Sequence, residues 1–137
     1  MQNDGYAIER EAYELRRSGL RKESLADYRR ASEAFRMAGD TAGEAHALRH
    51  AADVLSEMGS LEEADDVYRE TLELYRTHDS KPLDLANAVR AYAVLLDKRG
   101  DDAGALWTRA LELYERIGIA AGVEECRQRL EHPRGRP

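Results

Sequence analysis

The feature that most constrains this chain is a pattern that occurs three times along it. The copies read SGLRKESLADYRRASEAFR, MGSLEEADDVYRETLELYR and RGDDAGALWTRALELYER, and their glycines recur about every forty residues. Each glycine is followed by an aromatic residue and then a small one, and each is preceded by an alanine further upstream. The matching sets are Gly19, Gly59 and Gly100; Tyr28, Tyr68 and Trp107; Ala31, Thr71 and Ala110; and Ala12, Ala52 and Ala93. Such a repeat predicts one structural unit used several times.

Each copy has the pattern of two helices joined by a glycine turn. In the middle copy, apolar residues recur at helical spacing on both sides of Gly59, which can adopt the left-handed conformation that ends a helix. Ser60 and Glu63 then have the spacing of a capping box, which predicts the start of the second helix. The sequence therefore predicts an all-α fold of three helix-turn-helix hairpins.

The expected hairpins cover residues 5–40, 44–79 and 84–118 approximately. A last helix at about 119–130 has an apolar stripe that includes Val123 and Cys126, and we expect it to cap the third hairpin. Residues 5–130 are expected to form one domain. Residues 1–4 and 131–137 lack the pattern and are expected to be a frayed start and a disordered tail.

The composition narrows the class of protein. The 137 residues carry a formal net charge of −6, which argues against a nucleic-acid binder. The sequence shows neither an apolar run of about 20 residues, as a membrane span needs, nor a secretory signal. Cys126 is the only cysteine, so the chain has no disulfide framework. These observations predict a cytoplasmic protein, and the excess of arginine over lysine with abundant alanine favours a bacterial source.

The matching positions resemble the tetratricopeptide repeat. The resemblance is carried by Leu48, Ala52, Leu55, Gly59, Leu61, Ala64, Tyr68 and Thr71, by Val89, Tyr92, Ala93, Leu96, Gly100, Ala103, Trp107 and Ala110, and less closely by Ile8, Ala12, Leu15, Gly19, Tyr28 and Ala31. The family usually closes its repeat with a proline, whereas this chain has Arg36, Arg76 and Glu115 there. The longer period is similar to that of many bacterial regulators. The resemblance implies a right-handed α-solenoid whose first helices line a concave groove that binds a segment of another protein.

The polar faces of these first helices are the candidate groove. In EAHALRHAAD the apolar residues fill one half of the helix, and the other half is polar. The predicted groove residues are Tyr6, Tyr13, Arg17, His46, Arg49, His50, Asp53, Asn87 and Arg90, and Glu9, Arg10, Val94 and Lys98 fall on the same arcs. Arg49 and Arg90 match across the repeats and are expected side by side, where two guanidinium groups suit an acidic or C-terminal carboxylate segment of a partner. Alternatively, these arginines pair with Asp53 and Glu57 and bind no ligand.

The histidine spacing also raises the possibility of a metal site. His46, His50 and Asp53 lie on one helical face and are residue types that bind zinc. Arg49 shares that face, however, and a fixed positive charge beside a divalent cation is unfavourable. No glutamate follows His46, so the zinc-protease pattern is missing. We therefore expect no metal and no cofactor.

The sequence offers no catalytic motif. It contains no phosphate-binding glycine loop after a strand and no serine in a nucleophile-elbow context. We therefore expect a protein-binding scaffold and not an enzyme, with no nucleic-acid or membrane partner. The alternative is a self-associating repeat module without a peptide ligand, because the first helix has no preceding element to cover it.

Overall fold

The computed structural model describes residues 4–78 and 80–133. These residues form helices and no strand, which confirms the predicted all-α class for this part of the chain. The helices are α1 (Gly5–Arg17), α2 (Arg21–Met37), α3 (Thr41–Glu57), α4 (Leu61–Thr77), α5 (Pro82–Arg99), α6 (Gly104–Ile117) and α7 (Ala120–Glu131). No helix within the described ranges has the length and apolar character that crossing a membrane requires. Residues 1–3 of the expected frayed start and 134–137 of the expected tail lie outside the described residues.

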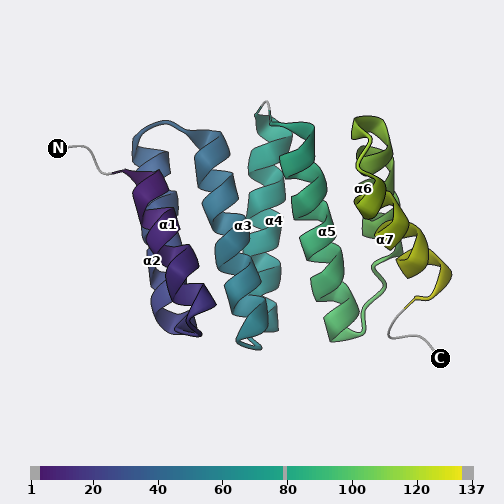
Figure 1. The fold of residues 1–137 in the computed structure, drawn as a ribbon, viewed down its shortest axis with the longest axis horizontal. Coiled ribbons are helices and arrows are strands. Elements are labelled where there is room, and N and C mark those ends of the chain that lie inside the picture. The colour runs from purple at the N-terminus through teal and green to yellow at the C-terminus, as the bar shows by residue number, and fades with distance from the viewer. Residues whose placement is uncertain (1–3, 79, 134–137) are drawn as a thin grey trace. The chain divides into compact units, whose positions relative to one another are not determined.

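The helices belong to two compact units (Figure 1). The N-terminal unit, Met1–Asp79, contains α1 to α4, and the C-terminal unit, Ser80–Pro137, contains α5 to α7. Within each unit every helix packs against the next one along the chain, and α1 also contacts α3. Successive helices therefore form antiparallel hairpins inside each unit. The single domain expected for residues 5–130 stays a prediction.

The turn between α3 and α4 forms at the predicted glycine. Gly59 has a φ of 84°, in the left-handed region. The amide of Ser60 donates to the Leu55 carbonyl at 2.9 Å, which closes the end of α3. The predicted capping box is wrong: the Ser60 side chain makes no capping hydrogen bond, and the Glu63 carboxylate is ion-paired with Arg29 of α2. A contact between neighbouring helices therefore replaces the local contact that the sequence indicated.

The helix that carries the histidines begins earlier than residue 44. Asp40 precedes α3, and its Oδ1 atom accepts a hydrogen bond of 2.9 Å from the amide of Gly43. This cap satisfies one of the amides that a helix N-terminus leaves without a partner, so Thr41 is already helical.

Pro82 is the first residue of α5, where its fixed φ suits a helix start.

The residues that match across the repeat form the core. Ala12, Ala52 and Ala93 are completely buried, and the aromatic rings of the three hairpins are almost completely buried beside them. Small residues on one helix thus allow the second helix to approach, and the ring on the second helix fills the remaining space. Cys126 of α7 is also buried, and burial raises the pKa of its thiol to about 11. This thiol packs as a small apolar side chain, as its position in the sequence indicated.

Two helix junctions depend on a glycine that leaves room for an aromatic ring. A Cβ atom at Gly43 of α3 would lie 2.4 Å from the ring of Phe35 of α2. A Cβ atom at Gly122 of α7 would lie 2.5 Å from the ring of Tyr114 of α6. Tyr114 follows Phe35 in the sequence by the same number of residues as Gly122 follows Gly43. The α2–α3 and α6–α7 junctions are therefore built in the same way.

Candidate functional site

A depression of about 290 Å³ lies over the first three helices of the N-terminal unit. Its lining residues are Tyr6, Glu9, Arg10 and Tyr13 of α1, Tyr28 of α2, and His46 and His50 of α3. The structure thus brings together the tyrosines and histidines that the helical spacing assigned to one groove. Tyr28 also lines the depression, although the sequence marked it only as a position that matches Tyr68 and Trp107 in the repeat.

Glu9 and His46 connect the two walls of the depression. The Glu9 Oε2 atom lies 2.7 Å from His46 Nδ1, so α1 and α3 are joined by a hydrogen bond between side chains. The His46 ring also meets the His50 ring edge to face, with centroids 4.6 Å apart. These contacts fix the imidazole of His46 at the surface of the depression. Residues spaced three and four apart on α1 line one helical face, which places Tyr6, Glu9 and Tyr13 together.

His50 is half-buried and forms the floor of the depression. Its ring stacks on Tyr28 at a centroid distance of 5.3 Å, and its Nε2 atom accepts a hydrogen bond of 3.2 Å from Arg49. Because a guanidinium group can only donate, the neutral imidazole carries its proton on Nδ1. That atom is buried and has no hydrogen-bond partner within the described residues. Burial first, and then the charge of Arg49, lower the pKa of His50 to about 2, so this ring is neutral at physiological pH.

Arg49 and Asp53 take part in a network below the depression. Arg49 Nη1 lies 3.4 Å from Asp53 Oδ2, and the Tyr68 hydroxyl of α4 donates a hydrogen bond to the other carboxylate oxygen. Burial raises the pKa of Asp53 despite the opposing effects of Arg49 and Tyr68. On the polar face of α3, Arg49 and Asp53 are therefore engaged with each other, whereas His46 and His50 line the depression. Arg49 pairs with Asp53, as the ligand-free alternative anticipated, whereas Glu57 pairs with Arg16 of α1.

The remaining predicted residues of α1 form the exposed rim. Tyr6 and Tyr13 are 59% and 50% exposed, although the Tyr6 ring also packs edge to face against Phe35. The guanidinium group of Arg17 lies 5.8 Å from the centre of the Tyr13 ring. The rim thus offers aromatic surface with polar tips, which is the kind of surface that protein interfaces favour.

The predicted groove residues of α5 make contacts inside the C-terminal unit. Arg90 donates to Glu125 of α7 at 2.6 and 3.0 Å, and the Tyr114 hydroxyl donates to Asn87 Oδ1 at 2.6 Å. Arg90 therefore has an internal carboxylate partner, which the sequence did not identify. Its expected position beside Arg49 stays a prediction, because the two residues belong to different units.

His46, His50 and Asp53 do not form a metal site in this structure. Within residues 4–78 and 80–133, no three histidine, cysteine, aspartate or glutamate side chains are placed to hold one ion. The two imidazoles meet edge to face, and Arg49 binds both His50 and Asp53. The guanidinium group thus satisfies the atoms that a cation would need.

The contacts at the depression recur in the C-terminal unit with different chemistry. The Glu9–His46 pair corresponds to Arg90–Glu125, because the repeat relates α1 to α5 and α3 to α7. The stack of His50 on Tyr28 corresponds to the guanidinium group of Arg129, which lies 4.9 Å from the centre of the Trp107 ring. The sequence contains this correspondence, because the offset that relates Tyr28 to Trp107 also relates His50 to Arg129. The offset identifies the two contacts as equivalent only when α7 is aligned with α3.

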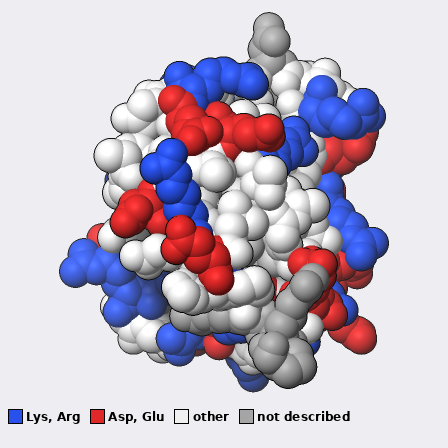
Figure 2. Space-filling view, turned by 90° about the vertical axis from the view of Figure 1, so that its right-hand side faces the viewer, with Lys and Arg blue, Asp and Glu red and all other residues white. Residues whose placement is uncertain are grey.

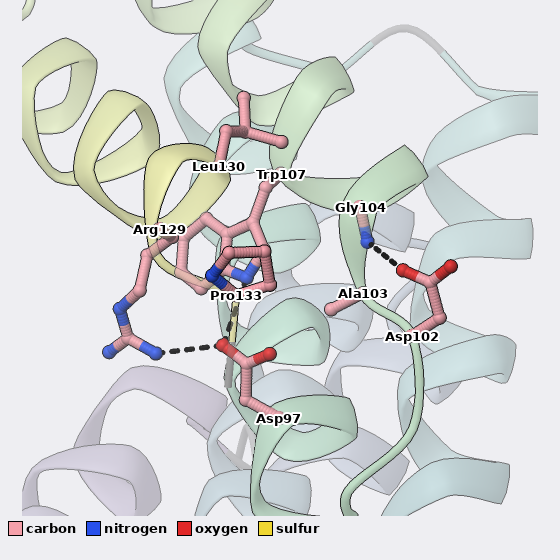
Figure 3. A pocket seen from close by; sticks show the side chains of 8 residues that line it. All are labelled: Asp97, Asp102, Ala103, Gly104, Trp107, Arg129, Leu130 and Pro133. Carbon is pink, nitrogen blue, oxygen red and sulfur yellow. Dashed lines mark hydrogen bonds and ion pairs between the residues drawn. The ribbon is translucent and has the colours of Figure 1, made fainter. Parts of the chain in front are cut away.

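A second cavity, of about 260 Å³, lies in the C-terminal unit and was not predicted (Figure 3). Asp97 of α5 is its central group, because its Oδ2 atom accepts from Trp107 Nε1 at 3.0 Å and from Arg129 Nη1 at 2.8 Å. On another side of the cavity, Asp102 accepts from the amide of Gly104 at the start of α6. Asp97 thereby joins α7 to α5 and α6, and the cavity lies beside this joint.

Charges of both signs are mixed on the side where α6 and α7 lie. Figure 2 shows lysine and arginine side chains next to aspartate and glutamate side chains around an uncharged area. The C-terminal unit contains such pairs, among them Arg127 with Glu115 and Arg99 with Asp101, at 3.1 and 3.2 Å. Charges of opposite sign are therefore interspersed on the described part of this face.

Comparison of the chain with protein-family models and with curated proteins gives no match.

Proposed function

We propose that this chain is a helical-repeat protein of the tetratricopeptide type that binds a segment of another protein. The observation that carries the proposal is the repeated helix junction, in which a ring, a glycine and a stacked side chain occupy matching places in both units. Units that repeat one junction are typical of solenoids, whose helices present a continuous binding surface. We propose a right-handed α-solenoid of three hairpins, acting as a scaffold in the bacterial cytoplasm.

The helix α7 supports this architecture, because it has the character of a cap. Its face toward α6 keeps the buried positions of α3, with Gly122 and Cys126 where α3 has Gly43 and Ala47. Its other face differs. Ala45 and Ala52 are completely buried in α3, whereas the matching residues Glu124 and Glu131 are charged and exposed. A helix that is apolar on one side and charged on the other closes a repeat and does not receive another one.

The depression on α1, α2 and α3 is the proposed binding site. It combines exposed tyrosine rings with the Glu9–His46 pair, so it offers apolar contact and hydrogen-bonding groups above the ring of His50. Arg10 lies at its edge and makes no ion pair within the described residues. An acidic side chain or a C-terminal carboxylate of the partner would therefore find its positive contact at Arg10, and not at the internally paired Arg49 and Arg90.

Selection of peptides from a random display library on the folded chain tests this function. We expect enriched peptides that contain an acidic group and whose affinity falls about tenfold or more in Tyr13→Ala and His46→Ala. The matched control is Leu83→Ala, which removes a comparably exposed side chain from the C-terminal unit and should leave the affinity unchanged. Failure to enrich any peptide, or equal loss of affinity in the control, would contradict the proposed site.

The polar network argues against a catalytic use of the same residues. The carboxylate of Asp53 is bound by Arg49 and Tyr68, and the neutral ring of His50 stacks on Tyr28. A general base must accept a proton from its substrate, whereas His50 Nε2 already accepts a hydrogen bond from Arg49 and the Asp53 carboxylate is already bound by Arg49 and Tyr68. We therefore propose binding without chemistry.

A further inference from the structure

The outer face of α1 carries a further hollow, which is larger than the depression and shares only Arg10 with it. Its volume is about 630 Å³, and its lining residues are Ala7, Arg10, Glu11, Glu14, Leu15 and Ser18. Ala7 and Leu15 supply its apolar floor, whereas Glu11 and Glu14 are exposed at its surface. The hollow contains none of the aromatic or histidine side chains of the proposed peptide site.

Comparison with the equivalent face of α3 shows which kind of structural element fits this face. On α3, the matching positions are Ala47, Ala51, Val54 and Met58, and these residues pack against α2. Ala47 contacts the cluster around Phe35, and Ala51 and Val54 contact the cluster around Tyr28. On α3, this face therefore packs against a helix. The equivalent face of α1 has the same helical geometry and forms the hollow.

The side chains of this face determine the chemistry of its partner. Glu11 and Glu14 replace the apolar residues Ala51 and Val54 of α3. Glu11 makes no ion pair within the described residues, and Glu14 has only Arg17, at 3.9 Å and largely in solvent. Arg10 also lines the hollow, but the two exposed carboxylates outnumber it, so this face opposes a purely apolar helix and attracts a basic one.

We propose that the outer face of α1 docks an amphipathic helix of a partner protein, whose apolar residues cover Ala7 and Leu15 and whose lysine or arginine residues meet Glu11 and Glu14. A second copy of the chain fits this face poorly. The outward positions of α7 include Glu124 and Glu131, which would bring carboxylates against carboxylates. The occupant is therefore a basic helix from a different protein, and apart from Arg10 this face uses other side chains than the peptide site.

Two peptide libraries that differ in one feature test the proposal. Both contain helix-forming peptides with the same apolar positions at helical spacing, and the flanking positions carry lysine in one library and glutamate in the other. Binding to the full chain is measured by fluorescence anisotropy of enriched peptides. We expect enrichment from the lysine library alone, an affinity that decreases with salt, and a loss of about tenfold or more in Glu11→Lys/Glu14→Lys.

The matched control is Glu62→Lys/Asp66→Lys, which makes the same change in net charge at two exposed positions of α4. It should retain the affinity of the wild type, and circular dichroism checks that both variants are folded. Equal enrichment from both libraries, no enrichment from either, or equal loss in both variants would overturn the proposal. So would a wild-type dimer in sedimentation velocity that the Glu11→Lys/Glu14→Lys change dissociates, because the occupant would then be a second copy. Peptides selected for the Tyr13 and His46 site test the proposed function separately, since the hollow contains neither residue.

Discussion

The His50 ring of α3 lies over the Tyr28 ring of α2, with centroids 5.3 Å apart and planes 17° from parallel. In the C-terminal unit, Arg129 of α7 lies over Trp107 of α6 at the matching positions. In both cases the second helix of a hairpin supplies a buried ring, and the following helix supplies the group that covers it. The same place thus holds a neutral imidazole in one unit and a guanidinium group bound to Asp97 in the other.

The pH dependence of stability should report the burial of His50. Its lowered pKa means that the unfolded chain binds a proton near pH 6.5 while the folded chain does not. The stability that His50 contributes is therefore complete above about pH 6.5 and is lost as the pH falls toward about 2. The raised pKa of Asp53 acts in the opposite direction, because it favours the folded state as the pH falls.

Comparison of the wild type with His50→Gln separates the effect of His50 on the pH dependence of stability from that of Asp53. Between pH 7 and pH 5 we expect the wild type to lose about 2 kcal/mol of unfolding free energy more than the variant, since glutamine does not titrate. Urea denaturation at each pH measures the difference. Parallel losses in the two proteins would show that His50 is protonated as readily in the folded state as in the unfolded one.

The glycines at the two helix junctions should not tolerate a methyl group. Gly43→Ala and Gly122→Ala place a Cβ atom against the rings of Phe35 and Tyr114, so we expect each to destabilise the fold by about 1–3 kcal/mol. Gly104→Ala is the control, because its Cβ atom would meet only the Asp102 carboxylate, at 3.2 Å. Thermal unfolding measures all three variants. Equal stability of the junction variants and the control would contradict the described packing.

Asp97 should contribute more to stability than an ion pair on the surface. Asp97→Ala leaves the Trp107 Nε1–H group and Arg129 without their acceptor, and both Asp97 and Arg129 are largely buried. We expect a loss of about 2–4 kcal/mol, measured by chemical denaturation followed through the single tryptophan. Glu115→Ala, which removes the exposed pair with Arg127, should cost less than about 1 kcal/mol. Similar costs for the two variants would argue against the joint at Asp97.

The helices and their buried faces could be predicted from the sequence because they depend on local spacing. Gly59 ends a helix through its own backbone, and Ala12, Ala52 and Ala93 are buried at the positions that the repeat marks. Both signals are contained in a short stretch of chain. The α-helical class and the aromatic core residues followed directly from them.

The partners of the polar side chains could not be predicted, because they come from other helices. Glu63 was expected to cap its own helix but pairs with Arg29, and Arg90 pairs with Glu125 of a helix considered only as a cap. Which side chains pair depends on how adjacent helices align, and the spacing of residues within one helix does not specify that alignment. The polar face of α3 was interpreted as free for the same reason, although His50 and Asp53 are covered by Tyr28 and Tyr68.

Chemical-shift perturbation in the ¹⁵N-labelled chain, titrated with a peptide selected on it, tests the central claim most directly. We predict saturable shifts that cluster at Tyr6, Glu9, Tyr13 and His46, with small changes at the Asp97 joint. Tyr13→Ala should remove these shifts and Leu83→Ala should preserve them. Shifts confined to the C-terminal unit, or no saturable shift at the depression, would contradict a binding site on the first three helices.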